Sequence, residues 1–218
     1  KKNFLEQIKS CNPKIILTLK KFKEQFKNIQ NEIRLVDFNE FKNTDATKGE
    51  NEKSNISSLI YTSGTTSSPK GVPIKHENTI FTTKNIINIL KYSNSDIDII
   101  PLSLSHSFGL GCFHTALFVG STLILHKNTM NILEVLNSIK NNNATTFAAV
   151  PATLTSLVND FPEKFVEKCS GLRLIITNST KVPEDTINKI LKLLPDTKFA
   201  TYYGLTEASR STFMIFNE

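Results

Sequence analysis

The segment YTSGTTSSPKG, residues 61–71, concentrates hydroxyl side chains, glycines and one lysine at a density that no hydrophobic core uses. Gly64 and Gly71 permit a tight path with outward-facing backbone N–H groups, and Lys70 adds a positive charge on a long stem. The hydroxyl donors are Thr62, Ser63, Thr65, Thr66 and Ser67. Such a set suits a polyphosphate group. The alternative is a Ser/Thr-rich surface turn that binds no ligand. The position of the loop between two extended segments disfavours this alternative.

This loop differs from the common P-loop. In GxxxxGK[ST] the lysine follows the last glycine and precedes a hydroxyl residue, whereas Lys70 precedes Gly71 and has no Ser or Thr after it. If this loop binds phosphate, it does so with a geometry different from that of the common P-loop.

Short apolar runs typical of strands alternate with helical patterns along the chain. Strands are predicted at 14–19, 32–38, 56–62, 96–102, 121–126, 145–150, 172–177 and 198–203, and helices at 20–30, 76–92, 108–120, 130–141, 151–159 and 183–194. The alternation predicts an α/β fold: a parallel, helix-covered sheet of βαβ units. In helix 76–92, Ile80, Ile87 and Leu90 are predicted on one side. Ligands collect at the carboxyl ends of such strands, so we expect the site in the loops that directly follow strands.

Composition excludes several function classes. The formal net charge is +6, but the lysines are spread along the chain rather than clustered with aromatic residues, so no nucleic-acid partner is predicted. Cys11, Cys112 and Cys169 have no metal-ligand spacing and are interpreted as reduced thiols. No apolar run reaches the length of a transmembrane segment, and the opening KKNFLEQIKS lacks the apolar core of a signal peptide. A cytoplasmic location is predicted.

The segment YTSGTTSSPKGV resembles the phosphate-binding signature of the AMP-forming adenylating enzymes, the superfamily of acyl-CoA synthetases, firefly luciferase and peptide-synthetase adenylation domains. Ser67 stands where the family more often has glycine. The resemblance implies three ligands: ATP, Mg²⁺ and a carboxylate. ATP is converted to AMP in the reaction, and Lys70 is implied as a catalytic residue of the phosphate loop.

A second segment, PLSLSHSFGLG (101–111), resembles the family stretch near the reacting carboxylate. The resemblance implies Ser105, His106, Phe108 and Gly109 as substrate residues, with His106 donating to a developing acyl-phosphate oxygen or gating the pocket. The alternative is a histidine that merely caps the following helix. Amino-acid-activating members usually carry an aspartate here, so Ser105 and His106 indicate an acid without an α-amino group.

Two later segments complete the resemblance. Asn178, Ser179 and Thr180 occupy the turn that lies along the adenine in the family, but the usual glycines are missing, and an ordinary β-turn is the alternative. TYYGLTEAS (201–209) resembles the aromatic-Gly-x-Thr-Glu signature. It implies Tyr202 or, by alignment, Tyr203 against the base, with Gly204 beside it, Thr206 on the α-phosphate and Glu207 on Mg²⁺. For Glu207 the alternative is an exposed loop residue.

The function implied is acyl-adenylate formation followed by transfer to a thiol. That thiol belongs to coenzyme A or to the phosphopantetheine of an acyl carrier protein, and the residues do not discriminate between them. A fatty-acid-like substrate is favoured, because FGLGCFHTALF could form an apolar pocket wall, although an apolar helix is more often core. A degenerate nucleotide-binding module is a rival reading, and a purely structural module ranks last.

The resemblance covers only the middle of the family's length. We expect residues 1–55 to be a partial first subdomain ending in the polar stretch 42–55, and residues 56–218 to form the nucleotide- and acyl-binding αβ subdomain. The small C-terminal domain with its catalytic lysine is expected to lie outside this chain. Residues 1–218 alone are therefore expected to be inactive.

Overall fold

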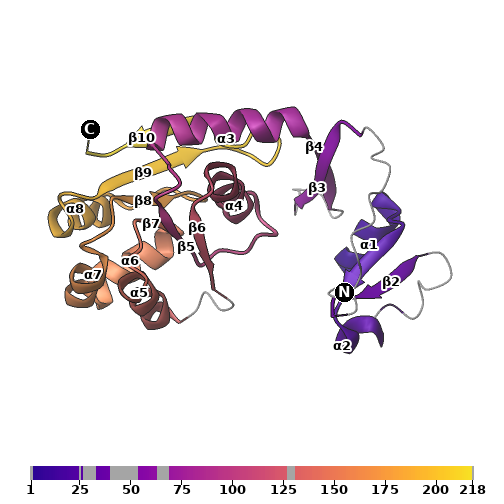
Figure 1. Ribbon diagram of the computed structural model, residues 1–218, viewed down its shortest axis with the longest axis horizontal. Helices are drawn as coiled ribbons and strands as arrows, with labels where there is room; N and C mark the ends of the chain where they lie inside the picture. Colours follow the sequence, from indigo (N-terminus) through magenta and orange to yellow (C-terminus); the bar gives the residue numbers. More distant parts are fainter. Residues whose placement is uncertain are drawn as a thin grey trace. The chain divides into compact units, whose positions relative to one another are not determined.

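A computed structural model describes residues 2–24, 26, 33–39, 54–62, 69–126 and 131–217. The chain folds into two compact units. The first comprises Lys1–Asn55 and Tyr61–Val72, and the second comprises Ile56–Ile60 and Pro73–Glu218 (Figure 1). Each unit has its own core.

The first unit is built on a small parallel sheet. Its helices are α1 (Lys2–Cys11) and α2 (Lys20–Lys23), and its sheet pairs β1 (Ile15–Thr18) with β2 (Arg34–Asp37). Ile8 of α1 packs with Phe26 and Ile33 in a small buried cluster. The hydroxyl of Tyr61 donates to the backbone carbonyl of Gln7 at 3.1 Å, which ties residue 61 to α1.

The second unit contains a six-stranded sheet with the order β10-β9-β8-β7-β5-β6. The strands are β5 (Ile97–Ile100), β6 (Thr122–Leu125), β7 (Thr146–Ala148), β8 (Leu174–Thr177), β9 (Lys198–Tyr203) and β10 (Thr212–Ile215). Neighbours from β6 to β9 pair in parallel, and β10 pairs antiparallel with β9. The predicted α/β class with a mostly parallel, helix-covered sheet is confirmed.

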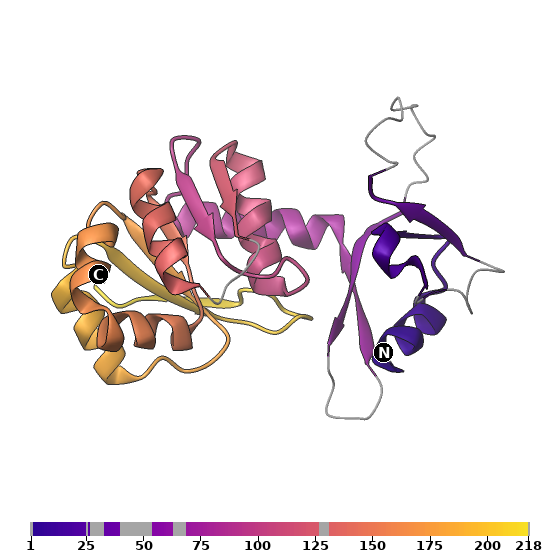
Figure 2. The same cartoon turned by 90° about the horizontal axis from the view of Figure 1, so that it is seen from below.

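Helices cover both faces of this sheet (Figure 1). They are α3 (His76–Leu90), α4 (Ser107–Val119), α5 (Ile132–Asn141), α6 (Pro151–Asp160), α7 (Pro162–Cys169) and α8 (Glu184–Leu193). Successive residues of a strand point to opposite faces: Phe147 packs with α5 to α8, whereas Ala148 packs with α3 and α4. Figure 2 turns the α5–α8 face toward the reader. Burial on both faces explains why these strands are apolar without alternation.

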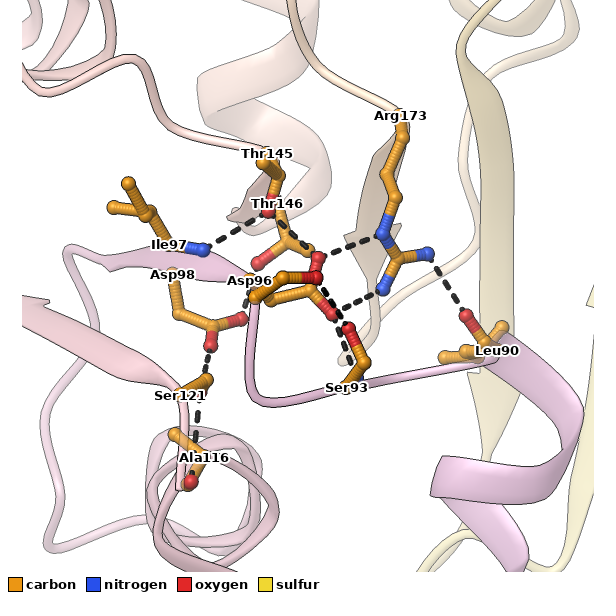
Figure 3. A network of polar contacts seen from close by, with 11 residues as sticks. Leu90, Ser93, Asp96, Ile97, Asp98, Ala116, Ser121, Thr145, Thr146 and Arg173 are labelled. Atoms are coloured by element: carbon orange, nitrogen blue, oxygen red, sulfur yellow. Dashed lines mark hydrogen bonds and ion pairs between the residues drawn. The ribbon is translucent and has the colours of Figure 1, made fainter. Parts of the chain in front are cut away.

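A polar network joins the amino ends of β5, β7 and β8 (Figure 3). Arg173 donates from Nε and Nη2 to the two carboxylate oxygens of Asp96, each at 2.7 Å, and Thr145 donates to Asp96 at 2.7 Å. The neighbouring Asp98 accepts from Ser121 at 2.6 Å and from Thr146. The network therefore holds three strands in register at the edge away from their carboxyl ends.

The two neighbouring carboxyl groups of this network differ in acidity. Burial alone would raise the pKa of Asp96, but the hydrogen bonds from Arg173, Thr145 and Ser93 outweigh burial and hold the pKa below its usual range. Burial raises the pKa of Asp98 above its usual range, against the hydrogen bonds from Ser121 and Thr146.

Some predicted elements differ from the structure. β3 (Ile56–Thr62) pairs with β4 (Lys70–Lys75) in a separate two-stranded sheet, so the expectation that the hydroxyl-rich loop follows a strand of the main sheet is wrong. β3 is only half apolar, and its Ile56 and Leu59 are exposed. On α3 the side chain of Ile80 is also exposed, and Ile86 is the residue buried beside Leu90. The sequence analysis did not predict α7 or β10.

Candidate functional site

The carboxyl ends of β5, β8 and β9 carry three of the four predicted loops. Loop 101–106 follows β5, the turn 178–183 follows β8, and the loop 204–211 follows β9. All three strands run parallel in one sheet, so their carboxyl ends share one edge. The strand order also reverses between β5 and β7, which is where open α/β sheets form ligand crevices.

A pocket of about 550 Å³ lies at this edge beside β8 and β9. It is lined by Asn178, Ser179, Thr180, Lys181, Thr201, Tyr202, Tyr203, Gly204, Leu205, Thr212, Phe213 and Met214. The predicted adenine turn and the first half of the aromatic-glycine motif, which lie 21 or more residues apart in sequence, therefore meet in one cavity. The lining offers backbone groups, hydroxyls and one lysine beside aromatic and aliphatic surface. That combination is typical of small-molecule sites.

The turn after β8 takes a conformation that glycine normally supplies. Ser179 has φ +100°, a left-handed backbone conformation that costs residues with a side chain free energy. Asn178 precedes it, and its side-chain amide donates to the backbone carbonyl of Tyr202 at 2.7 Å. The departure at Asn178 thus has a structural use, and Ser179 is the residue that bears the cost of the missing glycine.

The two tyrosines of the motif have different surroundings. Tyr202 is buried, with its ring edge-on to Phe108 at 5.5 Å between centroids and tilted against Phe213 at 5.6 Å. Tyr203 is 66% exposed. Both line the pocket, but only the Tyr203 ring is free to offer a face to a planar ligand.

Thr206 and Glu207 lie in the short loop between β9 and β10. Backbone hydrogen bonds between Leu205 and Ala208, in both directions, close this loop. A β-carbon added at Gly204 would overlap the backbone nitrogen of Arg210, so the turn requires glycine there. Thr206 is half-buried and Glu207 is exposed, and neither residue lines the 550 Å³ pocket.

The loop after β5 leads directly into α4. Ser105 and His106 are exposed, and His106 is the residue before the helix, with no side-chain capping bond. The alternative that its imidazole caps the helix therefore has no support. Phe108 and Gly109 are buried, and a β-carbon on Gly109 would lie 2.5 Å from the carbonyl oxygen of Ser103. Phe108 is thus a core residue on the Tyr202 side of the sheet, and Gly109 permits the loop to approach the helix.

The remaining predicted residues lie elsewhere or outside the described part of the chain. Thr62 ends β3 and the exposed Lys70 begins β4, and both belong to the first unit. Ser63, Gly64, Thr65, Thr66 and Ser67 lie outside the described residues.

Other chemistries find little support in the described residues. They contain no cluster of three or more His, Cys, Asp or Glu side chains that could hold a metal ion by themselves. Burial raises the pKa of Cys112 to about 11 and that of Cys169 to about 12, so these thiols stay protonated at neutral pH. In the same ranges of the chain, no helix is long and apolar enough to cross a membrane.

Comparison with known proteins agrees with the geometry. The model of the AMP-binding enzyme family matches residues 2–218. The chain belongs to the AMP-binding enzyme family.

Relatives of this chain include acyl-CoA ligases. The acyl-CoA ligase sidI of Beauveria bassiana is 30% identical over 165 residues, which are 75% of this chain and 28% of that protein. The chloroplastic/peroxisomal 2-succinylbenzoate–CoA ligase of Arabidopsis thaliana is 29% identical over 163 residues, covering 73% and 29%. The chain spans less than a third of these curated relatives.

Among solved structures, the o-succinylbenzoate coenzyme A synthetase of Bacillus subtilis in complex with ATP and magnesium ion is similar. Its TM-score is 0.82 and its identity 26%, over 98% of this chain and 44% of that one. The similarity extends through nearly the whole of this chain and so includes both of its units.

Sequence reasoning did not single out Arg210, a buried charged residue beside the TYYGLTEAS motif. Arg210 follows the TYYGLTEAS motif directly, is only 7% exposed and lies with its guanidinium 5.1 Å from the centre of the Tyr202 ring. Arginine is normally a surface residue, and no local pattern marked this one for burial.

Proposed function

We propose that this chain is part of an enzyme that activates a carboxylic acid with ATP and transfers the acyl group to the thiol of coenzyme A. The observation that carries the proposal is the pocket shared by the 178–180 turn and Tyr203, at the carboxyl edge of the sheet. Family membership supports it, because the relatives of this chain include acyl-CoA ligases.

In the first step a carboxylate oxygen of the acid attacks the α-phosphorus of ATP. A P–O bond forms, the bond to the bridging oxygen of the β-phosphate breaks, and pyrophosphate leaves. Tyr203 is assigned to the adenine face, Thr206 to the α-phosphate and Glu207 to the Mg²⁺ that accompanies ATP. Lys70 and the hydroxyl-rich loop are assigned to the β- and γ-phosphates. Their cationic and N–H groups stabilise charge that grows in the transition state.

In the second step the thiol sulfur attacks the acyl carbon, AMP leaves, and the thiol proton passes to solvent. His106 is assigned to the reacting carboxyl group. It is exposed at the start of α4, after β5, and its imidazole makes no hydrogen bond within the described ranges. A carrier-protein phosphopantetheine would undergo the same chemistry, and coenzyme A is preferred because the two relatives named above are CoA ligases.

The acid itself needs a separate argument. The expectation of a fatty acid rested on helix α4 as an apolar wall, but Phe108 and Cys112 of this helix are buried in the sheet core and Ala116 is buried as well. Relatives act on other acids, including 2-succinylbenzoate. The cytoplasmic location also stays a prediction, since one relative carries the name chloroplastic/peroxisomal.

Product analysis tests the proposal. The intact enzyme, incubated with ATP, magnesium, coenzyme A and a panel of acids, is expected to release AMP rather than ADP and to form one acyl thioester per AMP. ADP release, or AMP formation that ignores both acid and thiol, would contradict the proposal. A thioester formed on a carrier protein but not on coenzyme A would select the alternative acceptor.

A further inference from the structure

The buried side chain of Arg210 is held against helix α4. Its Nη2 donates to the backbone carbonyl of Phe108 at 3.2 Å and lies 3.8 Å from the sulfur of Cys112. A β-carbon added at Gly111 would overlap the guanidinium. Because Gly111 has no side chain, the guanidinium of Arg210 can lie against α4 at this position.

This guanidinium has no carboxylate partner within the described ranges of the chain. Its neighbours are the neutral phenol of Tyr202, the Cys112 thiol and a backbone carbonyl, and its Nε is buried without a hydrogen-bond acceptor there. The contrast within the same unit is Arg173, which is less buried and yet forms two charge-assisted bonds with Asp96. A buried charge without a counter-charge is unfavourable and calls for an anion.

Arg210 also contacts the segment that carries His106, the residue assigned to the acid. It contacts the carbonyl of Phe108, two residues after His106 on the same segment, and its own backbone abuts Gly204 at the pocket. The acid is thus the ligand that the proposed reaction brings to this side of the sheet. A guanidinium presents a fork of N–H donors that matches a carboxylate in shape and charge.

We infer that Arg210 determines the acid specificity of this enzyme, and that the substrate is an acid carrying a second carboxylate, which Arg210 binds while the first reacts with ATP. This inference rests on the proposed function and names its substrate class. A monocarboxylic acid of the same length would leave the guanidinium without its anion and would place apolar atoms against it.

The first test compares matched acids. Acid-dependent ATP–pyrophosphate exchange is measured on the intact enzyme with pairs of equal chain length, each an α,ω-dicarboxylic acid and its monocarboxylic counterpart, together with aryl acids with and without a second carboxylate. We expect kcat/KM to favour the dicarboxylic member of at least one pair by about tenfold or more. Exchange that is equal within every pair, or that favours the monoacids, would overturn the inference and leave the proposed function standing. No exchange with any acid would count against the proposed function itself.

The second test uses Arg210→Met, which keeps much of the side-chain volume and removes the charge. The preference is expected to reverse toward the monoacid, with the KM for ATP changed by less than about twofold. A purely structural role of Arg210 would lower exchange with both acids alike, and that result would overturn the inference. Arg173→Met is the matched control, because it removes the other arginine of this unit and should leave the acid preference unchanged.

Gly111→Ala gives an independent check with the arginine still present. The added methyl group displaces the guanidinium, so the dicarboxylic preference should fall, and combination with Arg210→Met should cost no more than Arg210→Met alone. Independent, additive losses in the double variant would show that the two residues do not share one space, and would contradict the inference.

Discussion

The side-chain amide of Asn178 donates to the backbone carbonyl of Tyr202 across 2.7 Å, and this bond joins the turn after β8 to the end of β9. Both residues line the pocket proposed for the nucleotide. The bond holds the carbonyl next to Tyr203, so it fixes the position of the peptide from which the exposed ring extends. Asn178 therefore shapes the pocket without having to touch the ligand.

Removal of this bond should weaken nucleotide binding. A hydrogen bond of this kind contributes about 1 kcal/mol, so Asn178→Ala is expected to reduce ATP affinity about fivefold. Asn178→Asp should be worse than alanine, because a carboxylate would face the carbonyl oxygen of Tyr202. Calorimetric titration of ATP into the intact enzyme measures both. Equal affinity of the aspartate variant and the natural protein would contradict this role.

Ser179 is expected to be a site where glycine stabilises the protein. Its φ of +100° costs about 1–2 kcal/mol, and the greater freedom of glycine in the unfolded chain offsets about 0.5–1 kcal/mol of the gain. Ser179→Gly should therefore raise the free energy of unfolding by about 0.5–1 kcal/mol, measured by urea unfolding followed by circular dichroism. Thr180→Gly is the control, since Thr180 has no positive φ and should lose stability. Destabilisation by both would refute the strain argument.

Tyr203 should contribute to ATP affinity through its ring. Stacking of a base on an aromatic side chain is worth about 1–3 kcal/mol, so Tyr203→Ala should raise the KM for ATP at least about fivefold. Tyr203→Phe keeps the ring and should stay within about twofold. Because Tyr203 is 66% exposed, neither change should lower the melting temperature much. A phenylalanine variant as weak as the alanine variant would mean that the hydroxyl, rather than the ring, makes the contact.

More of the fold than of the candidate site could be predicted from the sequence. Strands such as 172–177 were predictable because burial on both faces requires an unbroken apolar run, and the loops after them followed from the parallel arrangement. Two contacts, the Asn178 hydrogen bond and the burial of Arg210, could not be predicted from the sequence because they depend on which elements lie side by side. The Asn178 bond requires β8 and β9 to be neighbours, and the burial of Arg210 requires Gly111 of α4 to lie against the loop that follows β9. β3 was misplaced because a strand pattern does not specify its partner.

The pH dependence of stability should differ between two neighbouring carboxyl groups. The folded pKa of Asp96 lies below the unfolded value of about 3.9, so its contribution is present above that pH and is lost as pH falls through the folded pKa. The folded pKa of Asp98 is raised, so its ionisation weakens the fold as pH rises past about 3.9.

Asparagine at each position separates the two effects. Breaking an exposed ion pair costs about 1 kcal/mol, and breaking a fully buried one costs about 3–5 kcal/mol. Because Arg173 is partly exposed, Asp96→Asn should lower the free energy of unfolding at pH 7 by an amount between these limits. Asp98→Asn should cost far less, since it removes a penalised charge. Thermal unfolding from pH 3 to 8 measures both. A larger loss at Asp98 than at Asp96 would contradict the assignment.

If this site adenylates a carboxylic acid, the enzyme should catalyse isotope exchange between pyrophosphate and ATP. The intact enzyme, without coenzyme A, should exchange label only when a suitable acid is present. Glu207→Gln should reduce that exchange about a hundredfold or more, because the carboxylate assigned to magnesium loses its charge. Exchange without acid would exclude acid adenylation at this site, and full exchange in the glutamine variant would exclude the magnesium role of Glu207.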